Sequence, residues 1–325
     1  MGIITPMDKL RVAVIGVGYL GRFHAQKYAA LPGCSLAAVV DSRAEAGGAL
    51  AQELNTKAVV DYRELLGQVD AVSIATPTPA HFDIALAFLE SGAHVLVEKP
   101  ITETVAQAQQ LIAAAQRAGR VLQVGHLERF NPAIVAAEPL LRAPRFIECQ
   151  RLAPFRERGT DVNVVLDLMI HDLDIVQSIV GSAITRIDAI GTPVFSSEID
   201  IANARIRFAN GCVANATASR VSLKTERKLR IFQDDAYLSI DLQQKILTVI
   251  RKQSVPLGDS QLPVSIDEQS FEQGDALRTE IEAFLASCRG ERPVAVTGDD
   301  GMRALQTAVT IAQAVKANAV LSGTI

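Results

Sequence analysis

The first 125 residues alternate short apolar runs with segments whose apolar residues recur every three or four positions. The apolar runs lie at 10–15, 36–40, 58–60, 71–75, 95–97 and 121–124, and the helical segments include 44–54, 81–91 and 105–118. Strands separated by helices of this length are typical of a parallel, doubly wound sheet. Because the runs do not alternate with polar residues, helices should cover both faces of this sheet. The pattern therefore predicts the α/β fold class.

From about residue 184 the sequence alternates single apolar residues with polar ones. The alternating stretches are 199–208, 212–218, 229–232, 237–241 and 246–251, and Asn210-Gly211 is a hairpin signal between two of them. This pattern predicts an open, mainly antiparallel sheet with one face toward solvent or a partner. Two helices should follow, near 276–288 and 302–318. We place the domain boundary near Leu127, with an α/β domain over 1–127 and an α+β domain over 128–325.

Charge and hydropathy exclude several classes of protein. The net charge is −4, which argues against wholesale binding to nucleic acid. The longest apolar stretch, 162–180, contains three aspartates and a histidine, so it is not an ordinary membrane span. The first nine residues have no apolar core of a signal peptide, and the four cysteines form no close pair for a disulfide or a metal. We expect a cytoplasmic protein with reduced thiols.

A glycine-rich segment follows the first apolar run. Gly16-Val17-Gly18-Tyr19-Leu20-Gly21 has the spacing of the dinucleotide fingerprint, between a predicted strand and a predicted helix. The first glycine permits a tight turn, the second admits a pyrophosphate, and the third lets helix and strand pack closely. The helix N-terminus attracts the anion. We expect Gly16, Gly18, Tyr19, Leu20 and Gly21 to bind the cofactor; the alternative is a glycine-rich turn without a ligand.

Asp41 ends the second apolar run, 20 residues after Gly21. A carboxylate at this position accepts hydrogen bonds from the adenosine ribose and repels a 2′-phosphate, which favours NAD over NADP. Arg43 leaves the other cofactor open, because a guanidinium could bind that phosphate. A further alternative is that Asp41 only caps the next helix.

Two other segments end strands on the side of the sheet where ligands bind. Glu98-Lys99-Pro100 closes the fifth strand, and the Lys99 ammonium can hold and polarise an alcohol or ketone oxygen. Thr76-Pro77 closes the fourth strand and His81 follows it. We expect Thr76, Pro77, His81 and Glu98 to line the cofactor site.

The helix expected near 164–180 is apolar nearly all round. Its polar residues Asp167, His171, Asp174 and Ser178 fall at i, i+4, i+7 and i+11, so they share one stripe. Buried charge is costly unless it is paired or used. A histidine one turn from a carboxylate can be poised as a general base. The alternative is a structural histidine–aspartate hydrogen bond in a domain interface.

Arginine is concentrated in the middle of the chain. Eight arginines lie between 117 and 158, and no lysine occurs from 100 to 223. The guanidinium is the better fork for a phosphate or carboxylate, so this usage indicates an anionic substrate. Arg129, Arg151, Arg156 and Arg158 flank the proposed site, although solvated surface arginines explain many of the eight. His24, His94 and His126 are expected to be structural, and the five histidines show no metal-binding spacing.

Together, four motifs resemble the glucose–fructose oxidoreductase and inositol dehydrogenase family (Gfo/Idh/MocA). They are the fingerprint at 16–21, Ala75-Thr76-Pro77 with His81, Glu98-Lys99-Pro100, and Asp167 with His171. The resemblance implies an N-terminal Rossmann domain and a C-terminal substrate domain whose open sheet often mediates oligomerisation. It also implies that Lys99 and His171 lie at the nicotinamide with Asp167 as a companion carboxylate. We therefore expect NAD as cofactor, no metal, and a homodimer or homotetramer.

A narrower resemblance is to family members that oxidise the 3-hydroxyl of UDP-N-acetylglucosamine for lipid A synthesis. It is carried by 125–132 (GHLERFNP) and 161–172 (DVNVVLDLMIHD). The residues expected to contact the substrate are Lys99, Arg129, Asn131, Arg156, Arg158, Asp167 and His171. Two alternatives stay open: a dehydrogenase of a free sugar or inositol, and a non-catalytic regulator that binds NAD(H).

Overall fold

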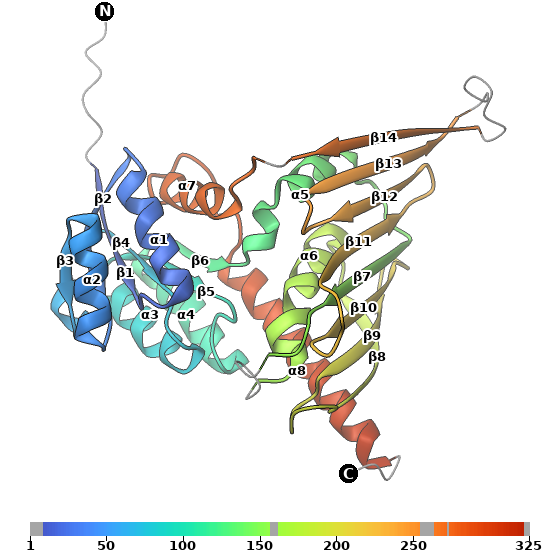
Figure 1. The fold of residues 1–325 in the computed structure, drawn as a ribbon, viewed down its shortest axis with the longest axis horizontal. Coiled ribbons are helices and arrows are strands. Elements are labelled where there is room, and N and C mark those ends of the chain that lie inside the picture. Colours follow the sequence, from blue (N-terminus) through green and yellow to red (C-terminus); the bar gives the residue numbers. More distant parts are fainter. Residues whose placement is uncertain (1–8, 157–161, 254–262, 272, 322–325) are drawn as a thin grey trace, which may run out of the picture. The chain divides into compact units, whose positions relative to one another are not determined.

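The structure, a computed structural model, describes residues 9–156, 162–253, 263–271 and 273–321 (Figure 1). The chain forms two compact units. Unit 1 comprises Met1–Leu127 and Leu277–Met302, and unit 2 comprises Glu128–Ala276 and Arg303–Ile325. The boundary near Leu127 alone would place 277–302 in the second domain, whereas in the structure this segment belongs to unit 1.

Unit 1 is built on a six-stranded parallel sheet. Its strands are β1 (Leu10–Ile15), β2 (Cys34–Val40), β3 (Lys57–Val59), β4 (Ala71–Ile74), β5 (His94–Glu98) and β6 (Leu122–Gly125). Their order in the sheet is β3-β2-β1-β4-β5-β6, which is the Rossmann order with its switch point between β1 and β4. The predicted doubly wound sheet is confirmed.

The helices of unit 1 are α1 (Tyr19–Ala30), α2 (Ala44–Leu54), α3 (His81–Glu90), α4 (Val105–Ala118) and α7 (Ala276–Cys288). Local signals fix their ends. For example, Thr104 and Gln107 form a reciprocal capping box at the start of α4, and Gly119 ends that helix in the left-handed conformation. From the C-terminal part of the chain, α7 adds Ile281 and Phe284 to the core that contains Tyr28.

Unit 2 contains an eight-stranded sheet. The strands are β7 (Phe146–Leu152), β8 (Ile184–Thr192), β9 (Ile201–Phe208), β10 (Val213–Ser219), β11 (Glu226–Phe232), β12 (Ala236–Asp241), β13 (Ile246–Lys252) and β14 (Val264–Ser270). Their order is β14-β13-β12-β11-β7-β10-β9-β8, and every pair is antiparallel except β7 with β10. The mainly antiparallel sheet is as predicted, but β7, β8 and β14 were not identified from the sequence.

Helices cover one face of this sheet (Figure 1). They include α6 (Ile170–Val180), which continues a π-helical turn at Val165–Met169, and α8 (Gly298–Leu321), whose unit 2 residues share the core. Small residues on β9 and β10 make room for them, since Ala204, Ala214 and Ala216 are almost fully buried. Most side chains of β9 and β10 that point the other way are polar, for example Asn203, which donates to Thr217 Oγ1 at 2.8 Å.

No helix in the described part of the chain has the length and the apolar character needed to cross a membrane.

Candidate active site

The glycine loop of unit 1 connects β1 to α1. Gly16 has a φ of +86° and donates to the Val40 carbonyl at 2.8 Å; a Cβ there would lie 2.9 Å from the Ala75 carbonyl carbon. A Cβ on Gly21 would overlap the Gly16 carbonyl. Both positions therefore require glycine, and together they bring α1 close to β1 and β4.

The start of α1 is open. Gly18 is its N-cap residue and has no side chain to cap the helix, and a Cβ on Gly18 would meet nothing within 4 Å. The first turn carries no acidic residue. Its backbone N–H groups thus have room for an anion, as a pyrophosphate requires. At the end of β4, the buried Thr76 Oγ1 has no hydrogen-bond partner among the described residues, which fits a polar ligand beside this loop.

Tyr19 and Leu20 form the first turn of α1. Tyr19 is largely exposed and stacks edge-to-face on Phe23, with 5.2 Å between ring centroids. Leu20 is half-buried. Their assignment to the cofactor site stays a prediction.

Asp41 lies directly after β2 and is 9% exposed. Its Oδ2 accepts from Val17 N at 3.1 Å, and its Oδ1 accepts from Arg43 N at 2.9 Å. Burial raises the pKa of Asp41, but these backbone N–H groups and the Arg43 guanidinium outweigh burial and leave the pKa below its ordinary value. Arg43, not Asp41, is the N-cap residue of α2. A stable carboxylate therefore lies beside the glycine loop, with Arg43 as its ion-pair partner.

His81 starts α3 and is buried. Its Nδ1 lies 2.9 Å from the Pro100 carbonyl and its Nε2 lies 2.9 Å from the Thr76 carbonyl. A neutral imidazole has one N–H and can donate to only one of them at a time. The side chain thus connects the loops that follow β4 and β5. Pro77, directly before the short 3-10 helix Thr78–Ala80, lies in the first of these loops.

Lys99 follows the last residue of β5, and the Lys99–Pro100 peptide is cis. Lys99 is half-buried, and its backbone N–H donates to Glu98 Oε2 at 3.3 Å. The other Glu98 oxygen, Oε1, lies 3.1 Å from His24 Nε2. The Glu98 carboxylate is thus engaged by protein groups inside unit 1.

The other predicted catalytic residues lie in unit 2. Asp167 is in the π-helical turn and His171 is in the first turn of α6; both are half-buried. Asn163 starts this segment, because its Oδ1 accepts from Val165 N and Leu166 N at 3.1 Å. A π-helical turn inside a helix is frequent at functional sites.

Two buried ion pairs hold α6. Arg151 on β7 donates to Asp172 at 2.8 Å and to Glu128 at 3.0 Å, and the Asp172 and Arg151 side chains are each 4% exposed. Burial raises the pKa of Asp172 above its ordinary value although Arg151 opposes the shift. Arg129 pairs with the buried Asp174 at 3.6 Å. The predicted stripe contains Asp167 and Asp174 but not Asp172; in the structure Asp172 and Asp174 are buried, whereas Asp167 is half-buried.

The residues expected to bind substrate have different environments. The Asn131 amide caps α5 (Pro132–Ala137) through Ala133 N, and its Nδ2 donates to the Leu242 carbonyl at 2.9 Å and to Glu128. Both hydrogens of the Asn131 side-chain amide are thus used inside unit 2. The ion pair of Arg129 with Asp174 also lies within unit 2. Arg156 is exposed, and Arg158 lies outside the described residues. Glu128 and Arg151 are structural partners that sequence spacing did not reveal.

Two family models match the chain. Residues 10–126 match the model of the Gfo/Idh/MocA oxidoreductase family with an NAD-binding Rossmann fold, and residues 156–322 match the C-terminal α/β domain of that family. The chain belongs to this family. The predicted family, fold class and cofactor are thereby confirmed, and the protein is an NAD-dependent oxidoreductase.

Individual relatives agree with this result. The UDP-N-acetylglucosamine 3-dehydrogenase of Acidithiobacillus ferrooxidans is 41% identical over 313 residues, 96% of this chain and 99% of the relative. A solved structure of that relative has a TM-score of 0.90 at 40% identity and covers 96% of this chain and 99% of its own. The myo-inositol 2-dehydrogenase of Thermotoga maritima is 25% identical over 318 residues, 91% of this chain and 93% of that protein. A levoglucosan dehydrogenase in complex with NADH and levoglucosan shares the fold, with a TM-score of 0.83 at 19% identity over 95% of this chain and 97% of its own.

The role of Asp41 predicts the cofactor preference. Wild type should bind NAD more tightly than NADP, and Asp41→Asn should weaken NAD binding by roughly 10-fold to 100-fold, the worth of a hydrogen bond to a charged group. Equilibrium titration of each nucleotide measures both. Arg43→Ala is the matched control and should leave NAD binding within a few-fold. Tighter binding of NADP by wild type would instead make Arg43 the determinant.

Proposed function

We propose that this protein oxidises the 3-hydroxyl of UDP-N-acetylglucosamine to a ketone with NAD as the hydride acceptor. The observation that carries the proposal is the 41% identity to UDP-N-acetylglucosamine 3-dehydrogenase over almost the whole of both chains. The TM-score of 0.90 to a structure of that relative supports it. In this role the 3-keto product is the substrate of an aminotransferase in lipid A synthesis, and the free cysteines fit a cytoplasmic location.

The glycine loop and Asp41 hold the cofactor in this mechanism. The open N-terminus of α1 receives the pyrophosphate, and the Asp41 carboxylate accepts from the adenosine ribose. When bound, the cofactor would supply the acceptor for the hydride that leaves the carbon carrying the reacting hydroxyl. The protein supplies position and charge.

Lys99 and His171 act on the substrate hydroxyl. His171 takes the hydroxyl proton as general base, and the Lys99 ammonium donates a hydrogen bond to the oxygen as it becomes a carbonyl. Asp167 orients His171 and stabilises the imidazolium that forms. The buried pairs Asp172–Arg151 and Asp174–Arg129 fix the helix that carries His171.

Substrate contacts complete the proposal. Arg156 is exposed and is our candidate for the diphosphate, together with Arg158. Asn131 and Arg129 are further candidates for substrate contact, and in the structure both also make contacts within unit 2. The alternatives are a dehydrogenase of a free sugar or inositol and a regulator that only binds NAD(H).

A turnover assay separates these functions. We expect NADH to form with UDP-N-acetylglucosamine and NAD, at a kcat/KM at least about 100-fold above that for N-acetylglucosamine or myo-inositol, because two or more charged hydrogen bonds to the diphosphate are each worth about 1.5–3 kcal/mol. NADH absorbance measures the rate. Faster turnover of a free sugar would reassign the substrate, and nucleotide binding without any turnover would leave the regulator.

Replacing His171 tests the proposed base. His171→Asn should lower kcat by roughly 10²-fold to 10⁴-fold, the usual worth of a positioned proton acceptor. NAD affinity should change little, because the residues proposed to bind the cofactor, Gly16–Gly21 and Asp41, lie in unit 1. Ser178→Ala, an exposed change on the same helix, is the control and should keep kcat. A His171→Asn protein that melts earlier but turns over normally would show that His171 is structural.

Assembly is proposed to run through the open face of the sheet in unit 2. The outward side chains of β9 and β10 include Asn203, Arg205 and Asn215, and Arg205 donates to Asn215 at 3.3 Å. We expect a homodimer or homotetramer by light scattering at micromolar concentration. Arg205→Glu should shift the mass downward, whereas Arg117→Glu, an exposed change on α4, should not. A monomeric wild type would reject this surface.

A further inference from the structure

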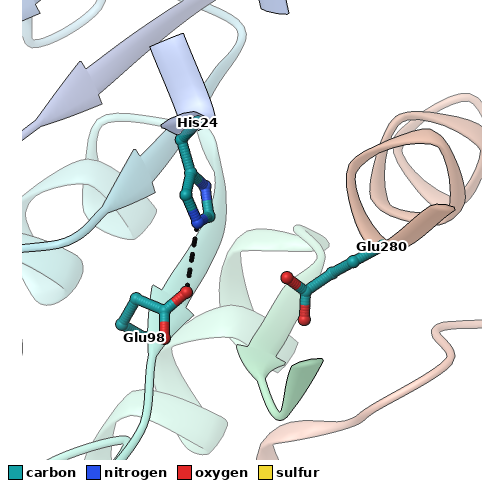
Figure 2. A group of neighbouring side chains, drawn as sticks. All are labelled: His24, Glu98 and Glu280. Atoms are coloured by element: carbon teal, nitrogen blue, oxygen red, sulfur yellow. Dashed lines mark hydrogen bonds and ion pairs between the residues drawn. The ribbon is translucent and has the colours of Figure 1, made fainter. Parts of the chain in front are cut away.

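Three buried titratable side chains meet inside unit 1, at the end of β5. His24 comes from α1, Glu98 from β5 and Glu280 from α7, and Figure 2 shows all three pointing toward one another. His24 and Glu280 are fully buried and Glu98 is 8% exposed. Their nearest ring nitrogen and carboxylate oxygens all lie within 4.8 Å of one another. The sequence predicts a structural role for His24 and no role for Glu280.

The two carboxyl groups of this cluster have opposite environments. Glu98 has a hydrogen-bonding neighbour at each oxygen, His24 Nε2 at 3.1 Å and the Lys99 backbone N–H at 3.3 Å. Neither oxygen of Glu280 has a hydrogen-bond partner among the described residues. An ionised carboxylate needs donors on its oxygens, so the surroundings disfavour the charged form of Glu280, whereas Glu98 has a hydrogen-bonding neighbour at each oxygen.

Among the described residues, the neighbouring Gln123 also gives the Glu280 carboxyl no donor. Gln123 on β6 uses its Nε2 to donate to the Glu280 backbone carbonyl at 3.4 Å, and its buried Oε1 is unpartnered as well. Glu280 and Gln123 therefore both have buried acceptor oxygens without a hydrogen-bond partner among the described residues. A proton on Glu280 turns one acceptor into a donor and removes a buried charge at the same time.

Electrostatics agrees with this placement of the proton. Burial first, and the neighbouring Glu98 second, raise the pKa of Glu280 well above its ordinary value. Tyr28 on α1 interacts electrostatically with Glu280, and also with Cys34 on β2 and Cys288 on α7. Tyr28 donates to or accepts from Ser73 Oγ at 2.7 Å, and Ser73 Oγ lies 3.2 Å from His24 Nδ1. The remaining nitrogen of His24 is thus left to face Glu98.

We propose that Glu98 is the positioning residue of Lys99, and that Glu280 beside it is a neutral carboxylic acid which leaves Glu98 the single negative charge of the cluster. Glu98 Oε2 holds the backbone N–H of Lys99, and His24 holds Glu98 through Oε1. The direction in which the lysine side chain leaves β5 is then set by the Glu98 carboxylate. This inference rests on the catalytic role proposed for Lys99.

Infrared spectroscopy tests the location of the proton without any substrate. Wild type labelled with ¹³C at the glutamate carboxyl should show a protonated carboxylic-acid carbonyl band at pH 7. Glu280→Gln should remove this band and Glu98→Gln should keep it. A band that is absent from wild type, or that Glu98→Gln removes instead, overturns the assignment. One bound metal ion per chain, measured by mass spectrometry of the purified protein, would also overturn it.

The stability of the same variants gives the pH dependence. The folded pKa of Glu280 is raised, whereas an unfolded glutamate titrates near about 4.3. The folded state therefore binds more protons, and wild type loses stability as pH rises from about 4.3 to the folded pKa. Glu280→Gln lacks this loss, so its melting temperature should exceed that of wild type at pH 8 and match it more closely at pH 5. A Glu280→Gln protein that is less stable at both pH values contradicts the proposal.

Kinetics of the matched pair test the positioning. The same change, Glu to Gln, should have unequal effects: Glu98→Gln should lower kcat by roughly 10-fold to 100-fold, as small misplacements do, with the KM for NAD changed little. Glu280→Gln keeps the charge on Glu98 and should lose less than about threefold. Equal losses, or a Glu98→Gln that does not fold, would mark the cluster as structural only.

Lys99→Met separates this inference from the proposed function. If Lys99→Met retains turnover, the role of Lys99 and the positioning by Glu98 both fail, while the infrared result still locates the proton. If Lys99→Met loses turnover and Glu98→Gln does not, the proposed function stands and the positioning fails.

Discussion

The close approach of α1 to the sheet is the contact on which the rest of unit 1 depends. Gly16 and Gly21 permit it, because a side chain at either position would meet the backbone of the facing segment. It puts Val17 N–H within reach of Asp41 and leaves the helix N-terminus open. One turn further along, the same helix sends His24 toward Glu98. One packing distance thus fixes both the cofactor loop and the surroundings of Lys99.

The main constraint in unit 2 is different, because helix α6 places charged side chains in the core. Asp172 and Asp174 are each 3% exposed, and an unpaired carboxylate there would cost several kcal/mol. Arg151 and Arg129 supply the counter-charges. Arginine suits this task because its guanidinium stays charged when buried and bridges two carboxylates, as Arg151 bridges Asp172 and Glu128. Part of the arginine enrichment in the sequence therefore reflects the support of α6.

Sequence patterns predicted those helices and strands whose bounds depend on apolar periodicity and on capping residues. The apolar run at 10–15 and the helices at 44–54, 105–118 and 276–288 have the expected bounds, because each is set by apolar periodicity and, for 105–118, by the Thr104 cap. Strand β7 was not predicted, because its outward residues Glu148 and Gln150 lie in an arginine-rich segment that the sequence pattern indicates as a ligand site. The pairing of Asp172 with Arg151 was missed for another reason: the partners are 21 residues apart and meet only through tertiary packing.

Residues 277–302 belong to unit 1, which the sequence pattern could not predict. Periodicity identifies α7 as a helix, but it cannot say which sheet the apolar side will cover. In the structure Ile281 and Phe284 are fully buried in the core that contains Tyr28, and Thr297 forms a β-bridge with Gln123. Residues 1–127 alone would therefore expose this core and would lack Glu280. It follows that the dinucleotide domain reaches its final packing only after residue 302 is part of the chain, so its folding cannot be complete when the first 127 residues emerge during synthesis.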